Sequence, residues 1–403
     1  MIYPKPSKIA SLQNIKNAWK ASRDSKGRGG APGIDKVRPL KYKENFETNI
    51  KNLRSKLLNG SYSFSSLKPN FIEKSDGQWR VICVPTVEDR LVQRLVLHHL
   101  CNKKDRLNVL TPNISYGVGR GTEQGVHAAI KQAIKKRNKS PWVLKTDVTK
   151  FFDQIPREHL LKRVNAKLGN SSLIPILESA IQCEVKAKNS HDREKLDSCG
   201  LVKGVGLRQG MPLSPILSKL VLSAFDRKAR RRKYNMVRYA DDIIIFCDSK
   251  EECEKVLVFV KQELEKLKLS VPSIESVNGK TEILAPDKAV IFLGVEIYQS
   301  GERKYLTRIP AKTVNYAKEK IKNHSHLNWN IQEGYSYATV VQRLKSIPDG
   351  YKAAFYDCTN VKDLLKELEK LAREVKKKLL IKVFGKNVFE SMTAEQKKFM
   401  GFE

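Results

Sequence analysis

The sequence predicts an α+β protein in which a mixed body of helices and strands is followed by a helical, basic C-terminal part. Two observations support this fold class. Between residues 122 and 298, segments with the apolar spacing of helices alternate with short runs rich in β-branched and aromatic residues. After about residue 305 the pattern becomes helical, and residues 361–386 carry nine Lys or Arg against four Asp or Glu. We therefore expect a helical module appended to the body.

The first expected elements follow from local composition and spacing. Residues 22–35 are rich in Gly and in basic residues and predict a loop or an extended arm. Residues 122–136 predict a helix with Thr122 as its N-cap, and residues 142–148 predict a strand. A second helix is expected to follow Ser214 as its cap, with Pro215 at the first helical position.

Two apolar runs joined by a short acidic connection predict a β-hairpin. The runs are Met236–Tyr239 and Ile243–Cys247, and Ala240-Asp241-Asp242 lies between them. Beyond this hairpin, residues 252–268 are expected to be helical and Val290–Tyr298 to form one strand.

The chain is strongly basic. Its 403 residues contain 76 Lys and Arg against 43 Asp and Glu, which gives a formal net charge of +33. Self-repulsion destabilises a compact protein with such a charge, so we expect an anionic partner to offset it, with nucleic acid as the first candidate. A solubility device and an anionic membrane surface are the alternatives. A hydrophobic content of 40% is enough for a real core and argues against wholesale disorder.

Several classes of protein are excluded by what the sequence lacks. No apolar run approaches the ~18 residues that a membrane span needs, and the first residues contain no apolar signal-peptide core. The seven cysteines form no CxxC pair, which argues against a disulfide framework and against a zinc ribbon. We therefore expect a reduced, cytoplasmic protein without a membrane partner.

Three carboxylates are the sharpest chemical feature. Asp241 and Asp242 are adjacent at the predicted hairpin turn, and Asp147 ends another apolar strand. Adjacent carboxylates repel one another unless cations neutralise them, although an Asp pair at a turn is also commonly just solvated. Acids that end two strands can converge on hard divalent ions. Two such metals ~3.5–4 Å apart clamp the attacking and leaving oxygens of a phosphoryl transfer, so the sequence predicts nucleotidyl transfer.

Several motifs, in order along the chain, resemble those of the reverse transcriptases. Tyr239-Ala-Asp-Asp242 is similar to the central motif of that family, residues 145–153 to its first acidic motif, and residues 208–215 to the loop and helix start between them. The bacterial group II intron branch is resembled most specifically. Its blocks correspond here to Gly33-Ile34-Asp35, residues 80–93, residues 115–127 (in which an expected Phe-Arg-Pro core is altered), residues 278–281 and residues 292–295. The resemblance covers roughly residues 30–300.

This resemblance implies an RNA-directed DNA polymerase with a right-hand fold of fingers, palm and thumb. The implied domains are an N-terminal arm and fingers over 1–140, a palm over 141–305 with an insertion near 165–205, and a helical basic thumb over 306–403. The implied cofactor is Mg²⁺, as two ions, with Mn²⁺ as a substitute. The implied partners are an RNA template, a DNA primer or nascent cDNA, and dNTPs. For the basic thumb the alternative is a solvated helix with Glu–Lys pairs.

The resemblance also implies roles for single residues. Asp147, Asp241 and Asp242 would hold the catalytic metals, with the Val148 carbonyl near the triphosphate. Phe152 corresponds to an aromatic that selects deoxynucleotides by colliding with a 2′ hydroxyl. The implied nucleotide-binding residues are Lys74, Arg80, Phe152, Gln209, Gly210 and Lys280, and the implied primer- or template-binding residues are Arg120, Tyr239, Phe292, Leu293 and Gly294.

Each of these roles has an ordinary structural alternative. The cations Lys74, Arg80 and Lys280 could be solvated surface residues, Phe152 a core residue, and Gln209 with Gly210 a plain loop. For two further sets of residues we expect a structural role and no part in the chemistry. Asp153, which precedes a proline and a helical run, is expected to cap a helix, and His98, His99 and His127 show no ligand spacing.

The biological role follows only from the resemblance. We see no His- and Cys-rich endonuclease module, little room for a maturase domain, and no Val-Thr-Gly triplet of the retron thumb. These features imply a free-standing bacterial reverse transcriptase, and many such relatives serve phage defence by copying a dedicated structured non-coding RNA. The alternatives are a retron or group II intron-type retroelement enzyme, an RNA-dependent RNA polymerase, and a catalytically silent RNA-binding protein on a polymerase fold. Template identity, priming, oligomeric state and partner proteins are left open by the sequence.

Overall fold

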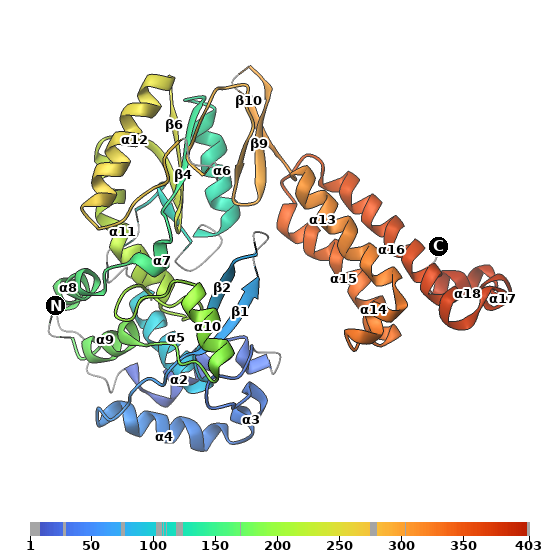
Figure 1. Cartoon of the computed structure of the whole chain (residues 1–403), viewed down its shortest axis with the longest axis horizontal. Coiled ribbons are helices and arrows are strands. Elements are labelled where there is room, and N and C mark those ends of the chain that lie inside the picture. Colours follow the sequence, from blue (N-terminus) through green and yellow to red (C-terminus); the bar gives the residue numbers. More distant parts are fainter. Residues whose placement is uncertain are drawn as a thin grey trace. The chain divides into compact units, whose positions relative to one another are not determined.

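The chain forms two compact units (Figure 1). The first comprises residues 1–133 and 142–283, and the second comprises residues 134–141 and 284–403. A computed structural model describes residues 9–26, 30–73, 77–101, 107, 109, 111–117, 124–169, 171–274, 280–302 and 304–400.

The N-terminal part of the first unit combines helices with a two-stranded antiparallel ribbon. Its elements are α2 (Leu12–Lys20), η1 (Asp24–Lys26), α3 (Pro39–Glu44), α4 (Phe46–Leu58), β1 (Lys68–Glu73), β2 (Trp79–Val84) and α5 (Val87–Cys101). The ribbon pairs β1 with β2 so that Ile72 lies opposite Arg80. Ser11 caps α2, because its side chain accepts a hydrogen bond from the main-chain N–H of Asn14.

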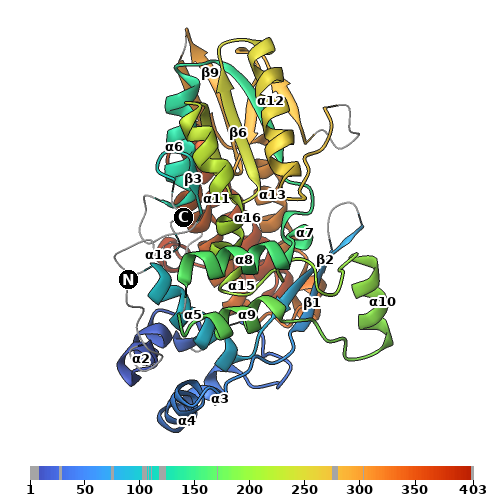
Figure 2. The same cartoon turned by 90° about the vertical axis from the view of Figure 1, so that its left-hand side faces the viewer.

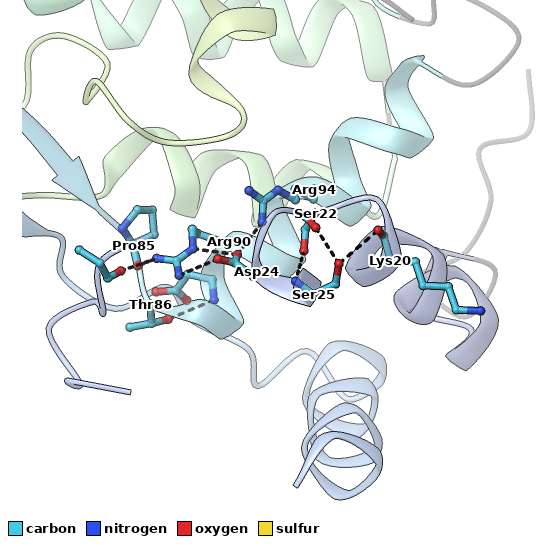
Figure 3. A network of polar contacts seen from close by, with 10 residues as sticks. Lys20, Ser22, Asp24, Ser25, Pro85, Thr86, Arg90 and Arg94 are labelled. Atoms are coloured by element: carbon cyan, nitrogen blue, oxygen red, sulfur yellow. Dashed lines mark hydrogen bonds and ion pairs between the residues drawn. The ribbon is translucent and has the colours of Figure 1, made fainter. Parts of the chain in front are cut away.

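A buried ion cluster ties the N-terminal arm to α5 (Figure 3). The carboxylate of Asp24, which is 3% exposed, binds Arg90 through two nitrogens at 3.1 and 3.2 Å and Arg94 through Nη1 at 2.7 Å. Arg90 also donates to the carbonyl oxygens of Ala31 and Pro85. The arm therefore has a fixed attachment on the first turn of α5, although its sequence reads as a loop.

The first unit contains a five-stranded sheet, with strand order β3-β5-β6-β4-β7. Its strands are β3 (Ser115–Tyr116), β4 (Trp142–Asp147), β5 (Asn235–Tyr239), β6 (Asp242–Cys247) and β7 (Glu282–Leu284). The predicted hairpin is confirmed as β5 and β6, and the predicted strand at residues 142–148 is confirmed as β4. Ile243, Ile244 and Ile245 are fully buried, which explains why β6 is apolar without alternation.

The other helices of the first unit lie partly against this sheet and partly beside the β1–β2 ribbon (Figure 2). They are α6 (Val126–Arg137), α7 (Phe151–Gln154), α8 (Arg157–Leu168), α9 (Ile174–Gln182), α10 (Ser190–Ser198), α11 (Ser214–Arg231) and α12 (Lys250–Glu265). The helices predicted at 122–136, after Ser214 and at 252–268 are confirmed with shifted ends, and Thr122 lies outside the described residues. The predicted cap of α11 is wrong by one residue: Leu213 is the N-cap, while the Ser214 hydroxyl donates to the Arg208 carbonyl at 2.9 Å.

The second unit begins with a three-stranded antiparallel sheet of order β10-β9-β8. Its strands are β8 (Val290–Phe292), β9 (Val295–Gly301) and β10 (Lys304–Arg308). The prediction of one strand over 290–298 is wrong, because the chain reverses at Leu293 and Gly294. Both residues have positive φ, 51° and 84°, as a two-residue type I′ hairpin turn requires.

The rest of the second unit is helical, as the sequence predicts. Its helices are α13 (Ala311–Lys322), η3 (Asn323–Ser325), α14 (Leu327–Gln332), α15 (Tyr337–Phe355), α16 (Val361–Phe384), α17 (Lys386–Glu390) and α18 (Ala394–Phe399). Helix α16 packs against α13 and α15 through an apolar face that includes Leu364, Leu368 and Ala372. Over the described ranges, no helix combines the length and the apolar character that a membrane span needs.

Candidate active site

The three predicted carboxylates gather at one end of the five-stranded sheet. Asp147 is the last residue of β4 and Asp242 the first of β6, and the antiparallel register pairs them directly. Residues paired in this way have Cα atoms ~4.5–5.5 Å apart. Asp241 precedes β6 in the turn, and its carbonyl accepts a hydrogen bond from the Val148 N–H at 3.2 Å. The two strands and the turn thus bring the acids together.

Burial and mutual repulsion act on these carboxylates. Burial raises the pKa of Asp241, and the nearby Asp147 raises this pKa further. Burial, followed by the charge of Asp241, raises the pKa of Asp242 to about 6. The Oδ1 atom of Asp147 is buried and, among the described residues, has no hydrogen-bond partner. Such an arrangement becomes favourable when cations neutralise the site.

Lys280 supplies one such cation from the protein itself. Its Nζ lies 2.7 Å from Oδ2 of Asp147, and its charge lowers the pKa of Asp241 and of Asp242. The Lys280 side chain is 56% exposed, so it can turn away from Asp147 toward solvent or a ligand. Lys280 thus reaches both the carboxylates and the pocket beside them.

The carboxylates suit a divalent metal by their chemistry. Across the ranges that the structure describes, no ready-made cluster of three or more His, Cys, Asp or Glu side chains holds a metal-like geometry. The possible metal ligands at this end of the sheet are nevertheless carboxylate oxygen atoms, which Mg²⁺ prefers. Among the described residues, Oδ1 of Asp147 is a buried acceptor without a hydrogen-bond partner. Asp147, Asp241 and Asp242 are therefore the residues that would hold such an ion.

A pocket of about 290 Å³ opens beside the acids and collects most of the predicted nucleotide-binding residues. Its walls come from β2, from the end of β4 with α7, from the segment after α10, and from the loop before α11. The sequence-predicted residues that line it are Arg80, Asp147, Val148, Phe152, Gln209, Asp241 and Lys280.

Two backbone contacts fix the walls of this pocket. The Phe152 carbonyl accepts a hydrogen bond from the Leu207 N–H at 2.7 Å, which holds the Phe152 ring at the pocket. The Gln209 carbonyl accepts from the Cys83 N–H at 2.6 Å. At Gly210, φ is 107° and a Cβ would lie 2.6 Å from the Cys83 carbonyl oxygen, so only glycine allows the loop to approach β2 this closely.

Asp153 does not cap a helix as predicted. It lies inside the short helix α7, and α8 has Pro156 at its N-cap without any side-chain cap bond. Asp153 instead lines the pocket, where its side chain is hydrogen-bonded to Gln209. Burial raises the pKa of Asp153, while the charges of Arg208 and Lys150 lower it. Asp153 therefore helps to orient Gln209.

Glu184 is a supporting residue that sequence reasoning missed. Its carboxylate binds Arg157 at 2.7 Å and Arg208 at 2.5 Å, and it also accepts a hydrogen bond from the Gly204 N–H. Both arginine side chains are buried. Glu184 thereby anchors the segment that leads into Gln209. The only sequence signal for this role is Arg208, the basic residue that opens the motif at residues 208–215.

The remaining predicted residues lie elsewhere. Tyr239 ends β5 and is half-buried, with its ring in contact with the backbone position of Gly117, where a Cβ would lie 3.3 Å away. Phe292 ends β8 of the second unit and is buried, and Leu293 and Gly294 form the β8–β9 turn. Lys74 and Arg120 lie outside the described residues. The roles of these six residues stay predictions.

Comparison with known proteins identifies the family. Residues 72–297 match the family model described as reverse transcriptase (RNA-dependent DNA polymerase). The chain belongs to the reverse transcriptase family. Its predicted right-hand polymerase fold and its predicted class, RNA-directed DNA polymerase, are thereby confirmed.

Several relatives share parts of this reverse transcriptase. Protein YkfC of Escherichia coli is 25% identical over 362 residues, which cover 77% of this chain and 88% of YkfC. An uncharacterized 91 kDa protein in the cob intron of Schizosaccharomyces pombe is 25% identical over 168 residues, 41% of this chain and 19% of that protein. YkfC is bacterial, and the second relative comes from an intron. The predicted resemblance to the bacterial group II intron branch is therefore confirmed.

Solved structures show more distant similarity. Telomerase from Candida albicans, solved with a fragment of telomeric RNA, is 13% identical with a TM-score of 0.44, covering 84% of this chain and 63% of that one. A chain of a partial Cas6-RT-Cas1–Cas2 complex is 23% identical with a TM-score of 0.35, covering 65% of this chain and 41% of that one.

Proposed function

We propose that this reverse transcriptase synthesises cDNA by two-metal nucleotidyl transfer at Asp147, Asp241 and Asp242. The observation that carries the proposal is the convergence of these three carboxylates, from two paired strands and a turn, at one end of the sheet. Two of them, Asp147 and Asp241, line a pocket that also contains cationic residues. Divalent ions, when bound, neutralise the charge that develops on the attacking and leaving oxygens.

The other pocket residues have roles that follow from their chemistry. Arg80 and Lys280 bind the triphosphate of the incoming dNTP, because their charges already act on the carboxylates at this edge. Lys280 leaves Asp147 when the triphosphate enters, and its exposed stem permits this movement. Phe152 occupies the space of a 2′ hydroxyl, and Gln209 with Gly210 lies against the nascent base pair. Positioning and charge neutralisation supply most of the catalysis in this class of reaction.

Primer extension on an RNA template with Mg²⁺ and dNTPs tests the proposal. We expect the Asp241→Ala variant to lose incorporation while it keeps most of its RNA affinity, since Asp241 acts on the metals and not on the template backbone. The matched control is Asp248→Ala, an exposed acid just beyond β6, which should behave like the wild type. Normal incorporation by Asp241→Ala, or equal loss of RNA binding and incorporation, contradicts the proposal.

We propose that the template is a dedicated structured non-coding RNA, copied in the cytoplasm of a bacterial host as part of antiphage defence. The support is the resemblance of the motifs at residues 33–35 and 80–93 to the bacterial group II intron branch of the family, many of whose free-standing relatives serve phage defence. Phage plating on a strain with the gene and its flanking RNA, on the deletion strain and on an Asp241→Ala strain tests the role. Equal plating efficiency on all three contradicts it.

A retroelement enzyme of the group II intron type is the second candidate, favoured by the relative in the cob intron. Sequencing the RNA and the attached cDNA that copurify with the protein separates the two. One short, defined RNA supports the first candidate, whereas cDNA of a mobile intron supports the second.

A further inference from the structure

The C-terminal end of α11 carries an unusual density of positive charge. Six of the seven residues 227–233 are Lys or Arg. The helix dipole favours cations at a helix C-terminus, but this modest effect falls off within the last turn. It accounts for one or two cations and leaves most of this run without an explanation.

Two of these cations face the neighbouring helix α12. Lys228 Nζ lies 2.5 Å from a carboxylate oxygen of Glu263, and the guanidinium of Arg232 lies 4.8 Å from the centre of the Phe259 ring. Residues three and four apart share a helix face, so Arg227, Arg230 and Arg231 lie together on a different face. We call Arg227, Arg230 and Arg231 the arginine face.

The arginine face continues onto α8, which packs against α11 (Figure 2). Arg163 of α8 donates from Nη1 to the Leu220 carbonyl at 3.3 Å. Leu220 lies about two helical turns before Arg227 on the same side of α11, so Arg163 extends the arginine face. Burial lowers the pKa of Arg163, and the charge of Arg227 lowers it further. We call Arg163, Arg227, Arg230 and Arg231 the α11 arginine cluster.

The α11 arginine cluster lacks compensating negative charge where it is most exposed. Within the described ranges, neither Arg230 nor Arg231 forms an ion pair with a carboxylate, and both side chains are exposed. Like charges held side by side repel one another, and a polyanion relieves this repulsion. Guanidinium groups also present a planar fork that matches two phosphate oxygens.

The surroundings favour nucleic acid over a membrane surface. A membrane-binding face combines cations with exposed large apolar side chains. Among the described residues, no exposed large apolar side chain lies on α8 or on α11. The chain is also a reverse transcriptase, so RNA is the polyanion that it must hold.

The cluster is separate from the polymerase pocket. Helix α11 starts at Ser214, which is bonded to Arg208 next to the pocket residue Gln209. With a rise of 1.5 Å per residue, Arg227 and Arg231 lie roughly 20 and 26 Å along the helix from this start. A nucleotide in the pocket therefore cannot contact the cluster.

We propose that the α11 arginine cluster anchors a double-stranded stem of the RNA that the enzyme copies, by contacts to the stem's phosphate backbone. Such contacts position the RNA without reading its sequence, and double-stranded RNA is recognised mainly by shape. The inference rests on the proposed function in taking a structured RNA as the template. It adds a second RNA-binding surface outside the pocket.

The test compares the Arg230→Gln/Arg231→Gln double variant with the wild type in filter binding to a stem-containing RNA at several salt concentrations. Loss of two phosphate contacts should make the negative slope of log affinity against log salt shallower by about two. The affinity at physiological salt should fall by about tenfold. The control is Lys255→Gln/Lys261→Gln, which removes two exposed charges from α12. It should stay within about twofold of the wild type.

Two further measurements fix the interpretation. Arg230→Lys/Arg231→Lys keeps the charge and should keep most of the affinity, and circular dichroism of all variants should match the wild type. Extension of a minimal, stemless template–primer duplex should be unaffected in the double glutamine variant. An unchanged salt slope, an equal loss in the α12 control, or an equal loss on stemless RNA overturns the anchor. Absence of extension by the wild type instead overturns the proposed function and leaves the binding result standing.

Discussion

A buried arginine supports the turn that presents Asp241. Ala240 has a φ of 53°, in the left-handed region, which costs roughly 1–2 kcal/mol for a residue with a Cβ. Nη1 of Arg238 donates to the Ala240 carbonyl at 2.6 Å, and its other nitrogens bind both carboxylate oxygens of Asp226. Arg238 and Asp226 are at most 1% exposed. Arg238 is therefore a positioning residue, because it holds a strained turn rather than touching substrate.

Arg238→Lys should lower kcat about ten- to a hundredfold with little change in the KM for dNTP, since lysine lacks the fork that joins Asp226 to the turn. Glycine adopts the left-handed conformation without strain, so adding Ala240→Gly should restore much of the lost rate. Ala240→Gly alone should be close to the wild type. Steady-state primer extension with the two single variants and the double variant measures this coupling. A double variant as slow as Arg238→Lys contradicts the positioning role.

The ring of Phe152 makes a prediction about substrate choice. It lies half-buried in the pocket wall, 5.5 Å from the ring of the buried Phe151. Phe152→Val opens space beside the sugar, so the ratio of kcat/KM for dNTP over rNTP should fall by roughly ten- to a hundredfold. Single-nucleotide incorporation with matched dNTP and rNTP measures the ratio. If the wild type used both nucleotides equally, the steric role of Phe152 would be wrong.

At the scale of elements, the buried Asp24 cluster attaches the N-terminal arm to α5 (Figure 3). Asp24→Asn removes the negative charge that two arginines share, and leaves the buried Arg90 without a counterion. Breaking a buried pair in this way destabilises a protein by about 3–5 kcal/mol. Urea denaturation should therefore show a lower midpoint for Asp24→Asn. The exposed pair of Asp287 with Lys288 is the control, and Asp287→Asn should shift stability by less than about 1 kcal/mol.

The strands and helices that the sequence predicts are those whose signal is local. Ile243–Cys247 has an unbroken β-branched and apolar run, and the Asp pair before it marks a turn, so the hairpin and its acids were predictable. The strand over 290–298 was wrong because Leu293, a residue that rarely has positive φ, gives no turn signal of its own.

The partners in the pocket could not be predicted in the same way. A local rule assigned Asp153 to a helix cap, but its partners Arg208 and Gln209 lie 55 and 56 residues further along the chain. Glu184 and Asp226 likewise have contacts that only the folded chain brings together. Sequence reasoning reached such residues only where a family motif supplied the long-range information.

At the scale of the whole molecule, a small acidic centre contrasts with the net charge of +33. Asp147, Asp241 and Asp242 concentrate negative charge at the sheet edge, while cations line the pocket at Arg80, Lys150 and Lys280. In the proposed mechanism the acids hold the metal ions, and the excess of cations is available for phosphate groups. This division predicts that template binding and chemistry respond differently to salt.

Binding of the RNA–DNA duplex should weaken steeply with salt, because each phosphate contact releases condensed counterions. If six to ten phosphates are contacted, affinity falls by ~10³–10⁵ between 50 and 200 mM salt. The rate of extension at saturating duplex should change far less, since the carboxylates Asp241 and Asp242 are partly buried and screened less than exposed charges. Filter binding and single-turnover extension over the same salt series separate the two quantities. A binding curve that is flat in salt, or a single-turnover rate that falls in parallel with affinity at saturating duplex, contradicts this division of charge.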